Sequence, residues 1–155
     1  MKIAEGLITK ADLEDKIYNL YSRASSNLLV QEGEDVQEDP IKLIQSIEEA
    51  NSSLVELKSK IHKANSQYML VDEDGNSLGM TIQEGLARVE GLISLASKLR
   101  NLAEKATPQN RYSKSEIKFL TTVDAQELQA KADELSMKAR NLDIAIQRTN
   151  WIVDL

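Results

Sequence analysis

Hydrophobic side chains recur at alternating intervals of four and three residues along most of the chain. The clearest run joins Leu43, Ile47, Ala50, Leu54, Leu57, Ile61, Ala64 and Tyr68. This spacing places all of these positions on one face of an α-helix, and it is typical of helices that pack side by side along an apolar seam. The pattern therefore predicts a long helix over about residues 40–66.

The same spacing predicts three more helices, over about residues 2–26, 82–106 and 124–150. Three start signals support these boundaries: Asp39 before Pro40, Thr81 three residues before Glu84, and Asp124 before the last helix. Asp and Thr at such positions accept hydrogen bonds from the free amides of the first turn, and Thr-x-x-Glu has the form of a capping box.

The connections contain two candidate β segments. Asp74-Gly75 lies between short mixed runs within residues 67–80, which indicates a β-hairpin. Residues 116–123 alternate in polarity and are rich in β-formers, which predicts a strand. An isolated hairpin is marginally stable in water, but the pattern leaves open whether this strand joins it.

Together these elements predict a mainly α fold: an antiparallel, coiled-coil-like four-helix bundle of long helices with a small β-hairpin or strand element. A length of 155 residues suits a single helical domain over residues 1–155. Small seam residues such as Gly85 and Ala132 permit close approach of the helices.

Polar residues also fall in the seams, at Lys10, Asn27 and Thr149. A slender bundle with these residues and few aromatic side chains leaves some faces to be buried by another subunit. We therefore expect a homo-oligomer.

Charge and composition narrow the class of protein. The chain has 19 Lys+Arg against 25 Asp+Glu, a formal net charge of −6, which disfavours non-specific nucleic-acid binding. No apolar run is long enough for a signal peptide or a membrane-spanning helix. The absence of cysteine excludes disulfides and thiolate metal sites and suits a reducing compartment. We expect a cytoplasmic protein without a transmembrane segment.

No catalytic motif is present. His62 is the only histidine, and no carboxylate lies at helical spacing from it to orient a base or a metal ligand, so we interpret it as a surface or half-packed residue. The glycines form no phosphate-binding loop, and no serine lies in a nucleophile elbow. The sequence predicts a protein that is not an enzyme, with no cofactor, no metal and no catalytic residue.

The loop after Pro108 is the main candidate for binding. Residues 110–119 gather cations and aromatic side chains in an otherwise acidic chain: Arg111, Lys114, Lys118, Tyr112 and Phe119. Such cations suit an anion or a nucleic-acid backbone. In the alternative interpretation, which we favour, they pair with acidic loop residues such as Glu32 while the aromatic rings cover an end of the bundle.

Three stretches of the chain together resemble the septicolysin-like family of small bacterial helical proteins. They are Leu29 to Glu34 with Glu38-Asp39-Pro40, Arg111 to Lys118, and Asp143 to Gln147 with Asn150-Trp151. The resemblance covers nearly the whole chain. It implies a helical protein without an established biochemical role, and it implies no catalytic residue. Combined with the loop, it gives a candidate interaction surface of Arg111, Tyr112, Ser113, Lys114, Glu116, Lys118, Asn150 and Trp151.

Our leading hypothesis is a non-enzymatic protein that acts through self-assembly or through a helical protein partner, with no nucleic-acid partner expected. Two alternatives stay open. One is a membrane-active, cytolysin-like protein, suggested by the family name and the amphipathic helices. The other is an anion- or nucleic-acid-binding module at residues 110–119.

Overall fold

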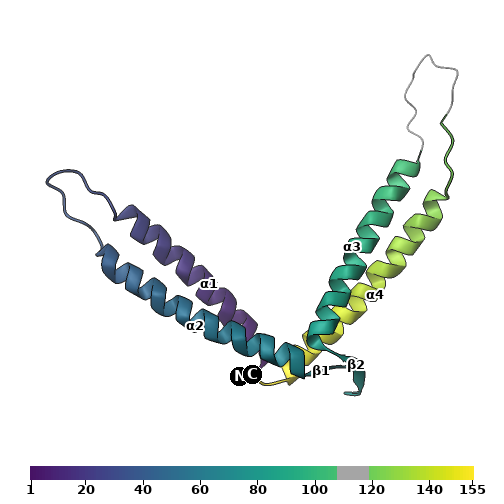
Figure 1. The fold of residues 1–155 in the computed structure, drawn as a ribbon, viewed down its shortest axis with the longest axis horizontal. Helices are drawn as coiled ribbons and strands as arrows, with labels where there is room; N and C mark the ends of the chain where they lie inside the picture. The colour runs from purple at the N-terminus through teal and green to yellow at the C-terminus, as the bar shows by residue number, and fades with distance from the viewer. Residues whose placement is uncertain (108–118) are drawn as a thin grey trace, which may run out of the picture. The chain divides into compact units, whose positions relative to one another are not determined.

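The computed structural model describes residues 1–107 and 119–155, and these form helices and one small sheet. In chain order the elements are α1 (Ile3–Ser26), α2 (Pro40–Gln67), β1 (Met69–Val71), β2 (Ser77–Thr81), α3 (Ile82–Ala106) and α4 (Ala125–Ile152) (Figure 1). The mainly α fold with a β-hairpin is confirmed. All helix boundaries lie within about two residues of those expected from the apolar spacing and the caps.

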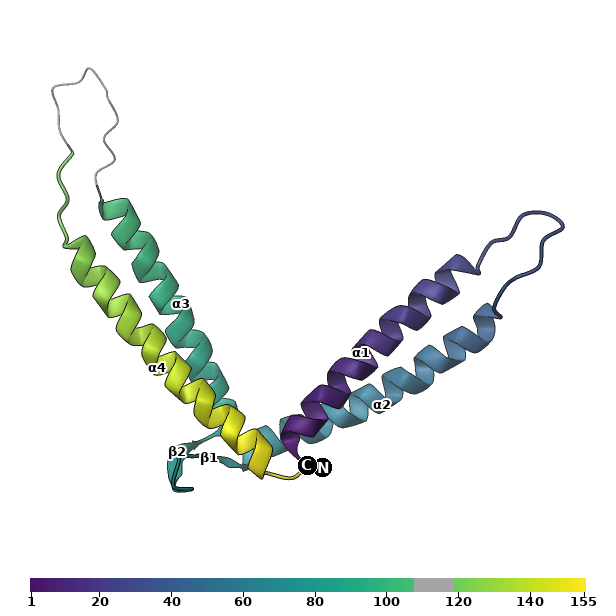
Figure 2. The same cartoon turned by 180° about the vertical axis from the view of Figure 1, so that it is seen from behind.

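The described residues form two compact units, one of Met1–Tyr68 with Arg148–Leu155 and one of Met69–Gln147. Each unit contains an antiparallel helix pair. In Figure 1 and in the reverse view of Figure 2, α1 lies beside α2 and α3 lies beside α4.

The predicted seam holds the α1–α2 pair together. Leu54, Leu57 and Ile61 are buried along α2. Near the other end of the pair, Leu20 and Leu43 belong to one buried cluster. Removing such side chains from water is the main favourable term for helices of this length, because propensity alone leaves them marginal.

The connection between α1 and α2 is fixed by polar contacts at both ends. Asn27 donates its side-chain amide to Arg23 O at 2.9 Å and accepts from the Glu38 amide at 3.1 Å. Arg23 and Glu38 also form an ion pair. At the start of α2, Asp39 Oδ1 accepts from the Ile41 amide at 2.9 Å, which confirms the predicted cap.

The last residues of the chain lie against the first ones. The Ile3 amide donates to Val153 O at 3.0 Å, and the Leu155 amide donates to Met1 O at 2.9 Å. We call this contact between residues 1–3 and 152–155 the terminal clasp.

In the second unit, β1 and β2 form the predicted hairpin as an antiparallel pair with Met69 opposite Thr81. Asp72 closes the turn: its Oδ1 accepts from the Asp74 amide at 3.0 Å and from the Asn76 amide at 2.8 Å. These hydrogen bonds, the one from the Asn76 amide foremost, lower the pKa of the Asp72 carboxyl.

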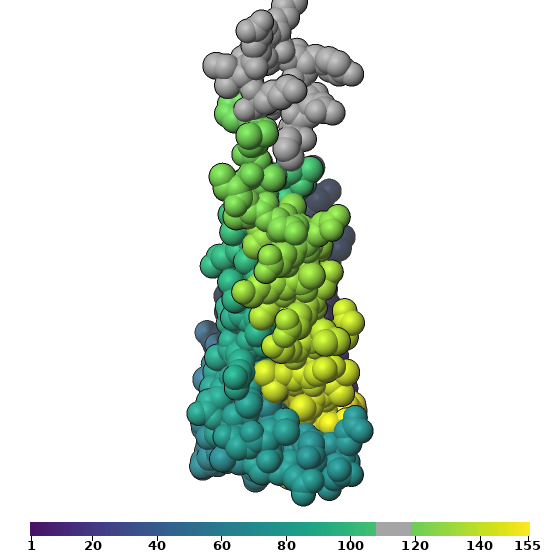
Figure 3. All heavy atoms as spheres, turned by 90° about the vertical axis from the view of Figure 1, so that its right-hand side faces the viewer, coloured from purple at the N-terminus to yellow at the C-terminus, as the bar shows by residue number. Residues whose placement is uncertain are grey.

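The α3–α4 pair packs closely through small residues, as the seam predicted. Ala96 and Ala103 of α3 and Ala132 and Ala139 of α4 are buried. The two helices lie side by side along their length in the space-filling view (Figure 3). Across the pair, Arg100 donates to Asp133 Oδ1 at 3.0 Å and to Ser136 Oγ at 2.8 Å.

The prediction of a strand over residues 116–123 is wrong for the part that the structure describes. Residues 116–118 lie outside the described residues, and residues 119–123 are irregular. Phe119 is exposed, and Thr121 Oγ1 donates to Val123 O at 2.8 Å, so the side chain satisfies the backbone locally where a strand would need a partner. The alternation of polar and apolar residues does not distinguish a strand that has a partner from an irregular segment of this kind.

Candidate interaction surface

Most of the predicted interaction surface lies outside the described residues, namely Arg111, Tyr112, Ser113, Lys114, Glu116 and Lys118. The two remaining members, Asn150 and Trp151, belong to the last turn of α4. Asn150 is buried, and its Oδ1 has no hydrogen-bond partner among the described residues. Trp151 is exposed. Neighbouring positions thus have opposite environments, and Asn150 belongs to the core of its unit.

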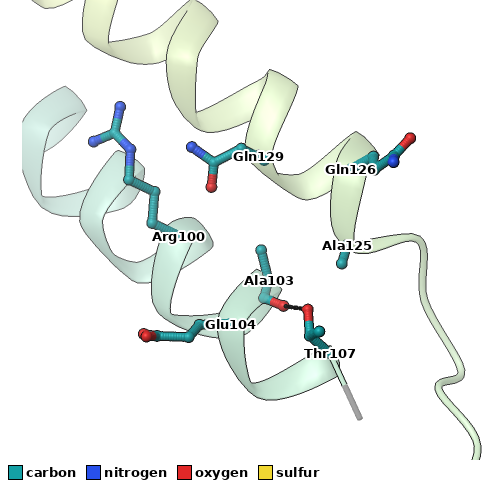
Figure 4. Close-up of a pocket in the computed structure, with 7 residues that line it drawn as sticks. All are labelled: Arg100, Ala103, Glu104, Thr107, Ala125, Gln126 and Gln129. Atoms are coloured by element: carbon teal, nitrogen blue, oxygen red, sulfur yellow. Dashed lines mark hydrogen bonds between the residues drawn. The ribbon is translucent and has the colours of Figure 1, made fainter. Parts of the chain in front are cut away.

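An open groove lies between the end of α3 and the start of α4 (Figure 4). Its volume is about 470 Å³, and it is lined by Arg100, Ala103, Glu104, Thr107, Ala125, Gln126 and Gln129.

The charges of this groove are balanced. Arg100 is already paired with Asp133 at 3.0 Å, and Glu104 adds a carboxylate to the lining. Glu104 and Gln126 point in opposite directions in Figure 4, so the polar groups do not converge on one point. The described part of the groove therefore has no unpaired positive charge for an anion.

The first unit carries a more continuous feature, a second four-three alternation on α1. It joins Leu7, Ala11, Glu14, Tyr18 and Tyr21, and we call these residues the outer stripe of α1. Tyr18 is 72% exposed and Tyr21 is 64% exposed. A helix with two heptad-spaced stripes has one seam for its partner in the pair and a second that is left without one.

The neighbouring helix carries a matching stripe. The outer stripe of α2 has the same spacing and consists of Ile44, Glu48, Asn51, Val55, Lys58 and His62. Lys58 Nζ lies 2.7 Å from Glu14 Oε1, so the two outer stripes lie on the same side of the α1–α2 pair. We call this side the outer face. Ile44 and Val55 are exposed on it.

The ion pair sets the electrostatics of the outer face. The hydrogen bond from Lys58 lowers the pKa of the Glu14 carboxyl, and the charge of Lys10 acts in the same direction. Glu14 therefore stays ionised throughout the neutral range. The outer face combines apolar and aromatic side chains with the Glu14–Lys58 pair and with the polar residues Glu48, Asn51 and His62.

The α3–α4 pair also exposes apolar side chains, but they are scattered over several sides. Leu86 and Ile93 lie on one flank of the seam of α3 and Leu95 and Leu102 on the other. On α4, Met137, Ile144 and Trp151 follow one another at intervals of one heptad. Single exposed apolar residues are normal on protein surfaces, whereas a continuous patch is informative. The outer face of α1–α2 is thus the stronger candidate.

The described residues contain neither a membrane-spanning helix nor a cluster of metal-ligating side chains. None of the helices in residues 1–107 and 119–155 combines the length and apolar character needed to cross a bilayer. Within the same ranges, the His, Asp and Glu side chains form no cluster placed to hold a metal ion. His62 is exposed on α2, in agreement with the interpretation of it as a surface residue.

Comparison with known proteins places the chain in a family. The model of a family described as "Family of unknown function (DUF6847)" matches residues 10–155. The chain belongs to the DUF6847 family. Among curated proteins no match is found.

A solved structure is similar over the full length of this DUF6847 chain. It is described as the crystal structure of a functionally unknown conserved protein from Corynebacterium diphtheriae, and it is 31% identical with a TM-score of 0.87. The match covers 100% of this chain and 98% of that chain. None of these descriptions names an enzyme, and the resemblance to the septicolysin-like family stays a prediction.

The sequence contained the signal for the outer face, although the predicted interaction surface did not include it. The interval from Leu7 to Tyr21 is two heptads, with Glu14 midway. In this DUF6847 chain, the first apolar stripe of α1 packs against α2. The second apolar stripe on the same helix then identifies the outer face.

Proposed function

We propose that this DUF6847 protein is a non-enzymatic helical protein that acts through self-assembly, with a second copy covering the outer face of α1–α2. The observation that carries this proposal is the heptad-spaced outer stripe of α1 with Tyr18 and Tyr21 exposed. The cytoplasmic location expected from the sequence stays a prediction.

The size of the outer face suits a stable dimer. A helix of 24 residues such as α1 is about 36 Å long, and two packed helices present a width of about 20 Å. The product is about 700 Å² per copy, close to the roughly 800 Å² that each partner contributes to a standard interface. Covering this face with another helix pair would give a four-helix arrangement with two-fold symmetry.

Its chemistry also fits a protein partner better than a lipid surface. Tyrosine is enriched in protein interfaces, because the ring contributes apolar area and the hydroxyl finds a hydrogen bond at the rim. Helices that lie on membranes carry many Lys and Arg on the polar side. The outer stripes instead contain Glu14 and Glu48 beside Lys58, so we favour a second copy of the chain over a membrane.

Sedimentation and light scattering test the proposal. The wild-type protein is expected to dimerise at micromolar concentration. Replacing Tyr18 and Tyr21 together by Lys removes both aromatic rings of the outer stripe of α1, and we expect it to raise the dimer Kd about tenfold or more.

The matched control is the pair Asn19→Lys and Ser26→Lys. These positions are exposed on α1 and lie away from the outer stripe, and the change adds the same two charges. We expect this control to dimerise like the wild type. A wild-type protein that stays monomeric throughout the micromolar range would overturn the proposal.

A further inference from the structure

The Glu14–Lys58 ion pair of the outer face distinguishes between the possible orientations of two copies. Glu14 and Lys58 lie 2.7 Å apart, and their side chains remain 42% and 40% exposed. Each charge therefore still has a side open to a group from outside. Glu14 also lies at the middle of α1, which runs over Ile3–Ser26.

Two symmetric arrangements bring one outer face fully onto another. When the two-fold axis crosses the helices at right angles, α1 lies over the partner's α1. When the axis runs parallel to the helices, α1 lies over the partner's α2. Because symmetric interfaces are self-complementary, the charges on the face distinguish these cases.

In the crossing arrangement, full overlap brings the midpoint of α1 next to its own symmetry copy. Glu14 then faces Glu14 of the partner subunit, and Lys58 faces Lys58 of the partner subunit. Like charges facing each other in an interface are strongly unfavourable.

In the parallel arrangement the same charges are complementary. Glu14 lies opposite Lys58 of the partner subunit, and the symmetry repeats this contact with the roles exchanged. The four charges form an alternating square, each with two opposite neighbours. The remaining charged or titratable groups of the α2 stripe, Glu48 and His62, lie on either side of Lys58 and come opposite the α1 stripe of the partner.

We infer that the two copies pair about an axis parallel to their helices, so that each α1 lies against the partner's α2 and the Glu14–Lys58 pairs form the alternating square. This inference rests on the proposed self-assembly and specifies its orientation. It makes the charge pair a determinant of specificity within the interface.

A charge-swap variant tests the orientation. Glu14→Lys combined with Lys58→Glu keeps the ion pair between the two helices and loses only the longer contact of Glu14 with Lys10 at 3.9 Å. We therefore expect the α1–α2 pair to stay folded, which circular dichroism checks. The variant is expected to dimerise with itself as the wild type does. The swap leaves the mass of the chain unchanged, so the variant is labelled with a heavy nitrogen isotope. The labelled variant and the wild type are unfolded together and refolded together, and the masses of the dimers are measured by native mass spectrometry.

The parallel arrangement predicts that mixed dimers are disfavoured, because they place the wild-type Glu14 opposite the carboxylate that Lys58→Glu introduces in the variant. We expect their share to fall about tenfold below the statistical half. Mixed dimers at or above the statistical share would overturn the inferred orientation while leaving self-assembly intact. Absence of any dimer, wild type included, would instead overturn the proposed function.

Cross-linking provides an independent measurement that needs no charge swap. The chain has no cysteine, so a Glu14→Cys chain mixed with a Lys58→Cys chain has one thiol per copy. Disulfides form only between nearby backbones. We expect mainly disulfides between the two different chains. Mainly disulfides between identical chains would overturn the orientation.

Discussion

Gly85 shows the effect of a single absent side chain. A Cβ at this position would lie 2.5 Å from Leu70 Cδ1 and 3.5 Å from Ile146, and Leu70 is fully buried. Gly85→Ala forces this contact apart, and overpacking in a filled core costs about 1 to 3 kcal/mol. We expect a lower free energy of unfolding by that amount, measured by urea denaturation.

Gly91 provides the matched control on the same helix, because nothing lies within 4 Å of a Cβ there. Alanine is favoured over glycine in a helix by about 0.5 to 1 kcal/mol, so Gly91→Ala is expected to stabilise. Two variants of the same chemistry would then have opposite signs. Equal effects of both on the free energy of unfolding would contradict the close packing at Gly85.

For single residues, the sequence predicted burial correctly where helical spacing alone decides whether a side chain is buried. The seam alanines and Gly85 were expected at close contacts and are buried there. Asn150 was expected on an interaction surface and is buried. The difference arises because burial in the last turn of α4 depends on which segments pack around it, and periodicity contains no such information.

At the scale of elements, the caps account for how well the boundaries could be predicted. Asp39→Ala removes the side chain that accepts from the Ile41 amide at 2.9 Å. Loss of such a cap costs about 1 kcal/mol. We expect this decrease in the free energy of unfolding, measured by chemical denaturation.

Asp35 is the control for this prediction, because it lies exposed in the same connection and its replacement by Ala removes the same charge. A surface change of this kind is expected to stay within about 0.5 kcal/mol. If Asp35→Ala destabilised as much as Asp39→Ala, the charge of the connection and not the cap would be responsible.

The elements also show where local patterns are insufficient. Asp74-Gly75 forms a hairpin because its two strands are adjacent in sequence and Asp72 closes the turn. Residues 119–123 have equally good strand formers and form none. A strand needs a partner, and whether a distant partner is available cannot be read from a run of eight residues.

At the scale of the whole molecule, the seams predicted which helices exist and that they pack lengthwise. The seams alone did not determine which helix packs against which. The structure resolves this with α1 against α2 and α3 against α4. The candidate outer face follows from that pairing, because a second alternation becomes meaningful only when the first has been assigned to a neighbour.

The terminal clasp gives a pH-dependent prediction at this scale. Lys2 Nζ donates to Asp154 Oδ2 at 2.9 Å, and this hydrogen bond is the main cause of the lowered pKa of Asp154. A carboxyl with a lowered folded-state pKa stabilises the fold above its unfolded-state pKa of about 4, and the contribution is lost as the pH falls through the folded-state value.

NMR titration of the side-chain carboxyls measures the pKa of Asp154 and so tests the contribution of Lys2. We expect the pKa of Asp154 to lie below its ordinary value in the wild type and to rise toward it in Lys2→Met. Lys2→Arg keeps the charge and is expected to keep most of the lowering. An unchanged pKa in Lys2→Met would show that Lys2 is not the cause.

The terminal clasp also has a consequence for synthesis on the ribosome. The first unit contains Met1–Tyr68 together with Arg148–Leu155, and the residues between them belong to the second unit. Domains generally fold as they emerge, from the N-terminus onward. Here the helix pair α1–α2 emerges early, but Ile3 can bond to Val153 only after translation has passed through the whole second unit. The first part of the protein to be made is therefore the last to be completed.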